Sequence, residues 1–342
     1  MTIPRSRAYL PAPGWLGPGA LLLLAYGVVP LVGNRYLFEA ILTPFLALSL
    51  AAVGLNLLTG YAGQVSLGTA ALMAVGAYAA YHFNLRIAGL PLTASIVFAG
   101  LSAAALGTAF GLPSLRLRGF YLAVSTLAMQ FFVQWVLTKF SWFSNDNPSG
   151  VIDAPSLAVF GVSFDTPVGR YLFALTVTVL LTAFAWRLVN TQAGYHFIAV
   201  RDNELAARVI GVPVLRTKLL AFGISSFIIG VAGVLWAFAY LRTVEPAGFN
   251  LDRSFQIVFI IIIGGLASIR GAFFGAALLV VFPLLLSRAG TLVFGGRFDS
   301  GVLDMSQRII LGALIIVFLI TEPDGLAALS DRLGRRLSST RF

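Results

Sequence analysis

The chain has 342 residues, of which 58% are hydrophobic and only 11% are charged; because soluble domains carry about a quarter charged residues, this composition excludes an ordinary soluble protein and predicts that lipid surrounds most of the chain. The net charge of +10 would suggest a nucleic-acid partner in a soluble protein, but the basic residues lie in short segments between apolar runs, which indicates the positive-inside bias of membrane proteins and no nucleic acid. The absence of cysteine excludes disulfides and thiolate metal sites.

Ten apolar segments are candidates for transmembrane helices. A bilayer core of about 30 Å needs roughly twenty apolar residues per helix, so the sequence predicts an all-α polytopic membrane protein with about ten transmembrane helices, some of them broken or short. Segments 254–267 and 272–286 are shorter than this, and we expect half-helices or tilted pieces there. The ten segments are 15–32, 36–58, 66–83, 87–112, 120–138, 171–189, 219–241, 254–267, 272–286 and 306–320.

Residues 59–68 interrupt the apolar stretch between the second and third segments. Three glycines and a glutamine are costly against lipid unless the backbone faces protein or a water-filled path, and broken helices expose backbone groups that can meet polar solutes. Two interpretations of the glycines, a solute path and close helix packing, are equally favoured. The side-chain amide of Gln64 needs hydrogen-bond partners, which favours a place on the path. The candidate path residues are Thr59, Gly60, Gly63, Gln64, Ser66 and Gly68.

Two hydroxyls, Ser125 and Thr126, lie inside the fifth segment and are further candidates for the path. Hydroxyls at such positions more often bond to the preceding helical turn than line a path. A long interval at 139–170 then follows, rich in Asn, Asp, Pro, Ser and Gly. Loops of this length are usually functional or disordered; here a simple connector is the favoured interpretation.

Residues 190–218 form the only long polar interval whose flanks are both strongly apolar and whose charges are mostly positive. The pattern predicts one short charged helix with two consecutive alanines on it, ended by Gly211, which tolerates left-handed backbone, and Pro213, which lacks an amide donor. Such a helix suits docking into a groove of another protein, with a plain surface loop as an equally weighted alternative. The candidate docking residues are Arg201, Asp202, Glu204, Ala206, Ala207, Arg208 and Gly211.

A second interruption lies at residues 264–268, where Gly264, Gly265 and Ser268 join the candidates for the path. Its G-x-x-S spacing repeats that of residues 63–66. The repeat suggests internal duplication, but it is too brief to establish one.

The distribution of charge predicts the orientation of the chain. With the N-terminus inside, 14 of the 23 basic residues and only five of the 13 acidic residues fall on the inner side. Ten spans with both termini in the cytoplasm fit this asymmetry, and they place 190–218 inside and 139–170 outside. Residues 1–322 then form the transmembrane domain, and 323–342 a short basic cytoplasmic tail along the inner membrane surface.

The sequence supplies neither an ion-coupling site nor a nucleotide site. No acidic or basic residue lies near the middle of a predicted span, where such residues usually mark proton relays or ion sites, and the chain has no phosphate-binding loop of the G-x-x-x-x-G-K-[ST] type. The two histidines lie far apart in the sequence and have no metal-ligand spacing, so no catalytic or metal site is expected. If the candidate path carries a solute against its gradient, the energy must come from outside this chain.

Three long motifs carry a resemblance to a known family. The runs GLNLLTGYAGQVSLGTAALMAVGAYAA (54–80), AVRDNELAARVIGVPVLRTKLLAFGISS (199–226) and IIIIGGLASIRGAFFGAALLVVFP (260–283) are similar to permease subunits of bacterial ABC importers of the branched-chain amino acid class. The similarity covers residues from about 46 to 283, and the interval 139–170 resembles the external loop of the long-loop paralogue in this family. The fold it implies is a multi-pass permease of the bacterial inner membrane.

The resemblance also implies partners and a substrate class. These are a second permease subunit, two ABC ATPase subunits that bind ATP and magnesium, and an external solute-binding protein. The docking residues of 190–218 would contact the ATPase, and the chain would form half of a path for branched-chain amino acids or another small solute (an amino acid, urea, an amide or an aromatic acid). It would be a transport subunit, not an enzyme. The alternative is a self-sufficient carrier or channel in which 190–218 is a passive loop.

Overall fold

A computed structural model describes residues 16–87, 89–114, 120–147, 149–159 and 162–294, and in the C-terminal part 309–310, 312–313, 316–317, 320–321 and 325–329. Helices dominate these residues. They are α1 (Leu16–Leu23), η1 (Leu24–Val28), α2 (Val29–Val32), η2 (Leu37–Leu42), α3 (Thr43–Asn56), η3 (Leu57–Tyr61), α4 (Thr69–Arg86), α5 (Leu92–Ser114), α6 (Phe120–Lys139), α7 (Pro167–Val189), α8 (Gln192–Asp202), α9 (Glu204–Val209), α10 (Val214–Val234), η4 (Leu235–Leu241), η5 (Pro246–Phe249), α11 (Leu251–Gly264) and α12 (Ile269–Phe294).

The helices form an all-α polytopic membrane bundle, as the composition predicted. Among the described residues, seven helical stretches are long and apolar enough to cross a membrane, and Gly19–Val32 is a shorter apolar helix. Nine of the ten predicted segments coincide with helices, counting α4 as the third. The tenth, 306–320, lies mostly outside the described residues, as does most of the predicted tail 323–342.

Of the two segments expected to be short, one is longer in the structure. The eighth is α11, a helix of 14 residues as expected, although the preceding η5 extends the apolar helical stretch to Pro246–Gly264. The ninth is α12, a helix of 26 residues. Pro283 lies inside α12 without ending it. The guanidinium of Arg288, beyond the predicted end at residue 286, lies over the ring of Tyr36, 5.6 Å from its centroid. The ninth segment is therefore not a half-helix.

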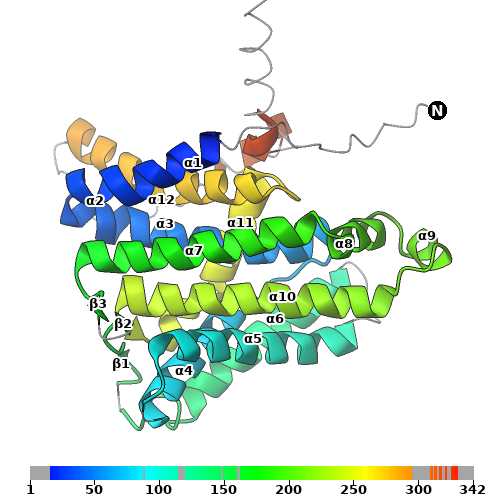
Figure 1. Ribbon diagram of the computed structural model, residues 1–342, viewed down its shortest axis with the longest axis horizontal. Helices are drawn as coiled ribbons and strands as arrows, with labels where there is room; N and C mark the ends of the chain where they lie inside the picture. The colour runs from blue at the N-terminus through cyan, green and yellow to red at the C-terminus, as the bar shows by residue number, and fades with distance from the viewer. Residues whose placement is uncertain are drawn as a thin grey trace, which may run out of the picture.

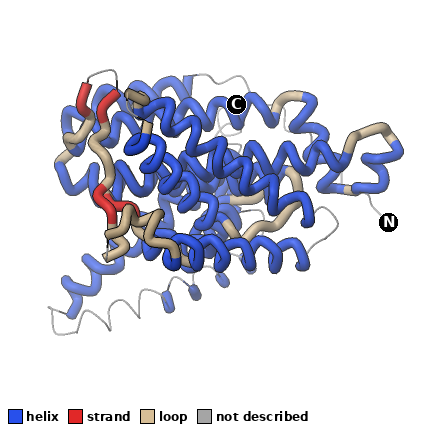
Figure 2. The backbone as a smooth tube through the Cα atoms, turned by 90° about the horizontal axis from the view of Figure 1, so that it is seen from below, coloured by secondary structure: helices blue, strands red, loops and turns tan. Residues whose placement is uncertain are grey.

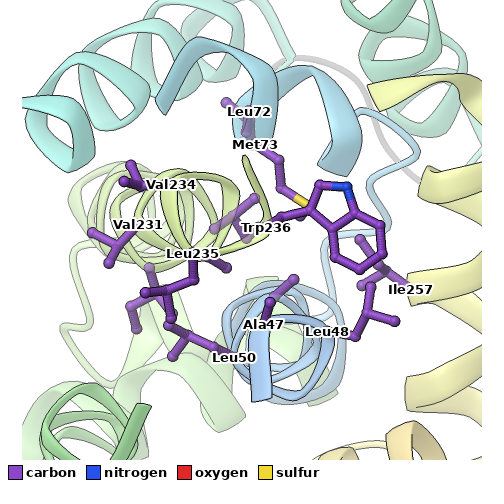
Figure 3. Packing of buried hydrophobic residues seen from close by; sticks show 14 of the residues in the cluster. Ala47, Leu48, Leu50, Leu72, Met73, Val231, Val234, Leu235, Trp236 and Ile257 are labelled. Carbon is purple, nitrogen blue, oxygen red and sulfur yellow. The ribbon is translucent and has the colours of Figure 1, made fainter. Parts of the chain in front are cut away.

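The core of the bundle surrounds α3. Thirteen of its fourteen residues are buried, and α4, α7, α10, α11 and α12 pack around it. In the close view, Ala47 and Leu48 of α3 face Trp236 and Ile257 across the core (Figure 3). Because lipid tails are as apolar as leucine, such packing depends on close van der Waals contact.

Glycines let α4 and α10 approach each other closely. A Cβ atom on Gly76 would collide with the backbone oxygen of Gly230, and one on Gly233 with the backbone oxygen of Met73. Small residues at both positions therefore bring the two backbones into direct contact, the usual way in which helices associate in membranes.

The polar segments lie at the two ends of the bundle. The helices α8 and α9 project at one end, and the short strands lie at the other, in both views (Figures 1 and 2). Strand β1 (Ile152–Asp153) pairs antiparallel with β4 (Thr243–Val244), and β2 (Ala158–Val159) pairs with β3 (Val162–Ser163). Leu157 between them is buried. The segment 139–170, expected to be a simple connector, is thus folded against the bundle.

Candidate functional site

The segment 190–218 contains two helices where the sequence predicted one. Asn203 separates α8 from α9 because its backbone is extended, with φ −159° and ψ 108°, and its side-chain oxygen accepts hydrogen bonds from the amides of Leu205 and Ala206 at 3.0 and 3.1 Å. This is the geometry of a helix N-cap. Arg201 and Asp202 therefore end one helix, and the remaining candidates begin the next. We call α8 and α9 together the coupling unit.

The predicted end of the helix at Gly211 is confirmed. Gly211 has φ +84°, its amide donates to the oxygen of Arg208 at 3.1 Å, and the amide of Val212 donates to the oxygen of Ala207 at 2.9 Å. These two bonds define a Schellman motif, in which glycine supplies the left-handed residue at no steric cost.

Two of the candidate docking residues hold α9 to the rest of the chain. Ala207 is 2% exposed and lies in a small apolar cluster with Val200, Val212 and Val214. The carboxylate of Glu204 forms an ion pair with the ammonium group of Lys218 on α10, and both side chains are mostly buried. The surfaces of Ala207 and Glu204 are thus used within the chain.

The outer surface of α9 is apolar. Leu205, Val209 and Ile210 are 63%, 87% and 73% exposed, and Ala206 and Arg208 are exposed beside them. The charges and the alanines of this helix were predicted from the sequence as docking residues, and these three side chains were not. The available signal was the presence of large apolar residues at 205, 209 and 210 on a helix otherwise rich in charge.

The first break, residues 62–68, follows the π-helical turn η3. The backbone amide of Gln64 donates to the backbone oxygen of Leu58 at 2.9 Å, and the hydroxyl of Thr59 donates to the backbone oxygen of Gln64 at 3.1 Å. Gly63 has φ +68°. The side chain of Gln64 is buried, and its Nε2 is buried without a hydrogen-bond partner. The break is therefore a folded turn in which Gln64 and Ser66 are buried and Gly63 and Val65 are exposed.

Side chains from other helices bind the backbone where α4 begins. Thr126 accepts from the amide of Leu67 at 2.9 Å and also donates to the preceding turn, at Ala123. The amide of Gly68 donates to the hydroxyl of Ser66 at 3.4 Å. Ser125, the neighbouring candidate, is only half-buried on α6.

Two residues missed by the sequence analysis complete this capping. The side-chain oxygen of Gln130 accepts from the amide of Ala71 at 2.6 Å and from the hydroxyl of Ser254 at 3.1 Å, and Ser254 accepts from the amide of Ala70 at 2.9 Å. The nitrogen of Gln130 donates to the oxygen of Phe249 at 3.0 Å. Both side chains are buried, and their signal was a polar group inside an apolar segment, which needs a partner.

The buried side chain of Asn56 binds the backbone of the second break, residues 265–268. Its oxygen accepts from the amide of Ala267 at 2.9 Å, and its nitrogen donates to the oxygens of Ser268 and Gly265 at 2.8 and 3.4 Å. Gly265 and Ala267 both have positive φ, at +112° and +56°. Gly264 packs against Gly271 of α12.

The two breaks and the coupling unit meet at Gly60. The guanidinium of Arg201 donates to the oxygen of Gly60 at 3.0 Å, and a Cβ atom on Gly60 would collide with Asn56 and the backbone nitrogen of Ala267. A cavity of about 300 Å³ lies beside this contact, lined by residues that include Gly63, Gln64 and Glu204. Candidates from two separate predictions, docking and path, are therefore neighbours.

Broken apolar spans packed in one bundle, with the coupling unit projecting from one end, define a polytopic membrane protein. Residues 37–319 match the family described as the permease component of the branched-chain amino acid transport system, and the chain belongs to this family of ABC importer permeases. It is a multi-pass protein of the bacterial inner membrane.

Curated relatives share most of its length. The high-affinity branched-chain amino acid transport system permease protein LivM of Escherichia coli is 31% identical over 90% of this chain and 73% of its own. The autoinducer 2 import system permease protein LsrC of an Enterobacter species is 28% identical over 86% of this chain and 75% of its own. The fructose import permease protein FrcC of Rhizobium meliloti is 28% identical, over 79% and 77%.

Proposed function

We propose that this chain is a transport subunit of an ATP-driven importer of branched-chain amino acids and forms half of the translocation path. The relatives named for branched-chain amino acid transport support this solute over autoinducer 2 or a sugar, because LivM of Escherichia coli is 31% identical and LsrC and FrcC are each 28% identical. ATP and magnesium belong to two partner ATPase subunits, and a second permease chain supplies the other half of the path.

The observation that carries this proposal is the coupling unit. It projects at one end of the bundle (Figure 1), exposes Leu205, Val209 and Ile210, and is tied to the interior through Arg201. A passive loop has no need of a capped helix with an exposed apolar surface. An apolar helix face of this size fits a groove on a partner protein, and here the partner is the ATPase.

The docking residues divide into two groups. Leu205, Val209 and Ile210, with Ala206 and Arg208, contact the ATPase directly. Glu204, Ala207 and Gly211 fix the position and the end of the helix that presents them. Arg201 and Asp202, at the end of α8, face the first break, so that movement of the ATPase reaches the membrane spans through them.

The opposite end of the bundle is the proposed site for the external solute-binding protein. Glu39 there accepts from Arg35 and Arg242 at 3.0 and 3.1 Å and lies 3.7 Å from Arg170. Asp165 also lies near Arg170, so acidic and basic side chains are interspersed at this end and offer polar contacts to a partner protein. This end also carries the folded segment 139–170.

The test is purification of the chain from its native membrane followed by reconstitution. We expect nucleotide-binding subunits to co-purify, and proteoliposomes that contain them and the solute-binding protein to import labelled leucine only when ATP is supplied. Import of labelled fructose is measured in the same way, as the alternative substrate. Leucine uptake by the chain alone, without nucleotide-binding subunits, would instead establish a self-sufficient carrier or channel.

A further inference from the structure

We infer that Arg201 and Asn56 are positioning residues that connect the coupling unit to both broken spans, so that one movement of α8 reaches the two breaks together. This inference rests on the proposed function, since it supposes that an ATPase moves the coupling unit. It assigns roles to two side chains that act through their neighbours. Neither is expected to touch the solute.

The first link is the guanidinium of Arg201. Its Nε and Nη2 atoms each lie 2.9 Å from the same carboxylate oxygen of Asp202, while Nη1 donates to the oxygen of Gly60 at 3.0 Å. The last carbonyls of a helix lack an intrahelical partner, and here a cation satisfies one of them at the negative end of the helix dipole. A lysine ammonium group cannot reproduce this planar arrangement.

The second link is the absence of a side chain at Gly60. Any Cβ atom there would overlap the side-chain oxygen of Asn56 and the backbone nitrogen of Ala267. The backbone before the first break therefore lies directly against the second break, although the two are more than 200 positions apart in the sequence. Gly63 adds a further contact, because its own missing Cβ leaves room for the stem of Arg201, with Cγ only 2.7 Å from that position.

The third link is Asn56, which is 1% exposed and binds three backbone groups of the second break. Ala267 has φ +56°, a conformation that costs free energy for a residue with a Cβ atom and persists only when its surroundings fix it. Asn56 supplies that constraint by accepting from the amide of Ala267. It stands four residues before Gly60, so the two lie on the same face at the end of one helical run.

These contacts leave no gap between the coupling unit and the second break. The C-terminal part of the chain adds to the same junction, because a Cβ atom on Gly325 would lie 2.5 Å from the backbone nitrogen of Gly265. A displacement of α8 must then either move the Gly60 backbone and the second break with it, or break the bond from Arg201. The first outcome couples ATP use to movement of the breaks, and the second uncouples them.

The test uses the complete transporter in proteoliposomes. This chain has no natural cysteine, so one introduced thiol is its only labelling site. A single L266C substitution places a thiol on the second break, where Leu266 is 53% exposed. The rate of maleimide labelling is measured without nucleotide and after trapping with ATP and vanadate. In parallel, the amount of leucine imported per ATP hydrolysed is measured.

With Arg201 present, we expect the labelling rate to change on trapping. In Arg201→Met this change is lost, and the import per ATP falls roughly tenfold, the factor that corresponds to one charge-assisted hydrogen bond. Arg187→Met is the matched control, because Arg187 is an exposed arginine at the end of α7, and it retains both signals. Gly60→Ala, which inserts the colliding methyl group, gives the same loss as Arg201→Met, whereas Gly27→Ala, with no atom within 4 Å, does not.

The outcomes separate this inference from the proposed function. If the unmodified transporter imports leucine with ATP but Arg201→Met retains its labelling change and its import per ATP, the positioning role is wrong and the function stands. If the unmodified transporter shows no ATP-dependent import, the proposed function fails first. Should Arg201→Met fail to assemble, Arg201→Lys keeps the charge without the planar fork and is tested with the same two measurements.

Discussion

Glu204 and Lys218 form an ion pair that fastens α9 to the start of α10, and their side chains are only 19% and 10% exposed. Removing one partner of a pair that is largely out of water leaves an uncompensated charge, which costs more than the pair itself contributes. We expect Glu204→Lys, which sets two ammonium groups against each other, to loosen α9 and to reduce the amount of ATPase that co-purifies with the chain.

The double variant Glu204→Lys with Lys218→Glu restores the attraction with the charges exchanged. We expect it to recover most of the ATPase binding that the single variant loses. Equal loss in the single and double variants would show that Glu204 contacts the ATPase itself and that the pair with Lys218 has no part in presenting the helix.

The exposed tip of α9 gives a second prediction. Val209→Asp places a charge where an apolar side chain would enter the partner, and we expect at least a tenfold weaker association with the ATPase, or about 1.4 kcal/mol. The folded state of the chain should be unaffected because Val209 is 87% exposed. The control is Val162→Asp on β3, at the opposite end of the bundle, where Val162 is 58% exposed. The measurement is co-purification, and equal effects of the two variants would contradict the docking surface.

Asn203 is expected to act as the N-cap of α9. Asn203→Ala removes the acceptor for the amides of Leu205 and Ala206 and should destabilise α9 by about 1 kcal/mol. Hydrogen exchange at these two amides would speed up by roughly fivefold to tenfold. Asn203→Asp keeps an acceptor and should exchange at the original rate; faster exchange in both variants would mean that the backbone conformation at 203, and not its side chain, sets the break.

Gln130 is expected to stabilise the fold. Gln130→Leu keeps most of the side-chain volume but leaves the amide of Ala71 and the oxygen of Phe249 without their partner inside the bundle. Each unsatisfied buried group costs about 1–3 kcal/mol, so we expect a clear drop in the midpoint of thermal unfolding in detergent. Gln134→Leu, one helical turn further along α6 and only half-buried, is the control, and an equal drop there would remove the assignment.

The contact of α4 with α10 gives a prediction about stability alone. Gly76→Ala forces a methyl group into the backbone of Gly230, and overpacking of this kind costs about 1–3 kcal/mol. The expected result is less folded protein recovered after heating. Gly27→Ala, where the added methyl group meets nothing within 4 Å, controls for the intrinsic effect of alanine in a helix.

Hydropathy alone predicted where most helices lie, because burying roughly twenty apolar residues in lipid leaves few alternatives. The glycines at 60 and 63 marked the first break for a similar reason, since polar and flexible residues are costly in a membrane span. The end of α9 at Gly211 followed from the steric freedom of glycine. The end of α12 was misjudged, since the prediction stops at residue 286 and the helix continues to Phe294.

The partners of buried polar groups could not be predicted. A single Asn56 within an apolar segment indicates that some hydrogen-bond partner exists, but the amide it binds lies 211 positions away, and nothing local identifies it. The two helices on either side of Asn203 were predicted as one. The preference of asparagine for N-cap positions, followed by an acidic first turn at Glu204, was the signal for two helices.

The contact between Gly60 and Ala267 has a consequence for how such a chain can change over time. Neither position can accept a larger residue on its own, because each is in direct contact with the other. Asn56 contacts both and hydrogen-bonds the amide of Ala267. Substitutions at 56, 60 and 267 should therefore be accepted together or not at all, and a library that randomises the three positions jointly should yield functional combinations that no series of single changes would reach.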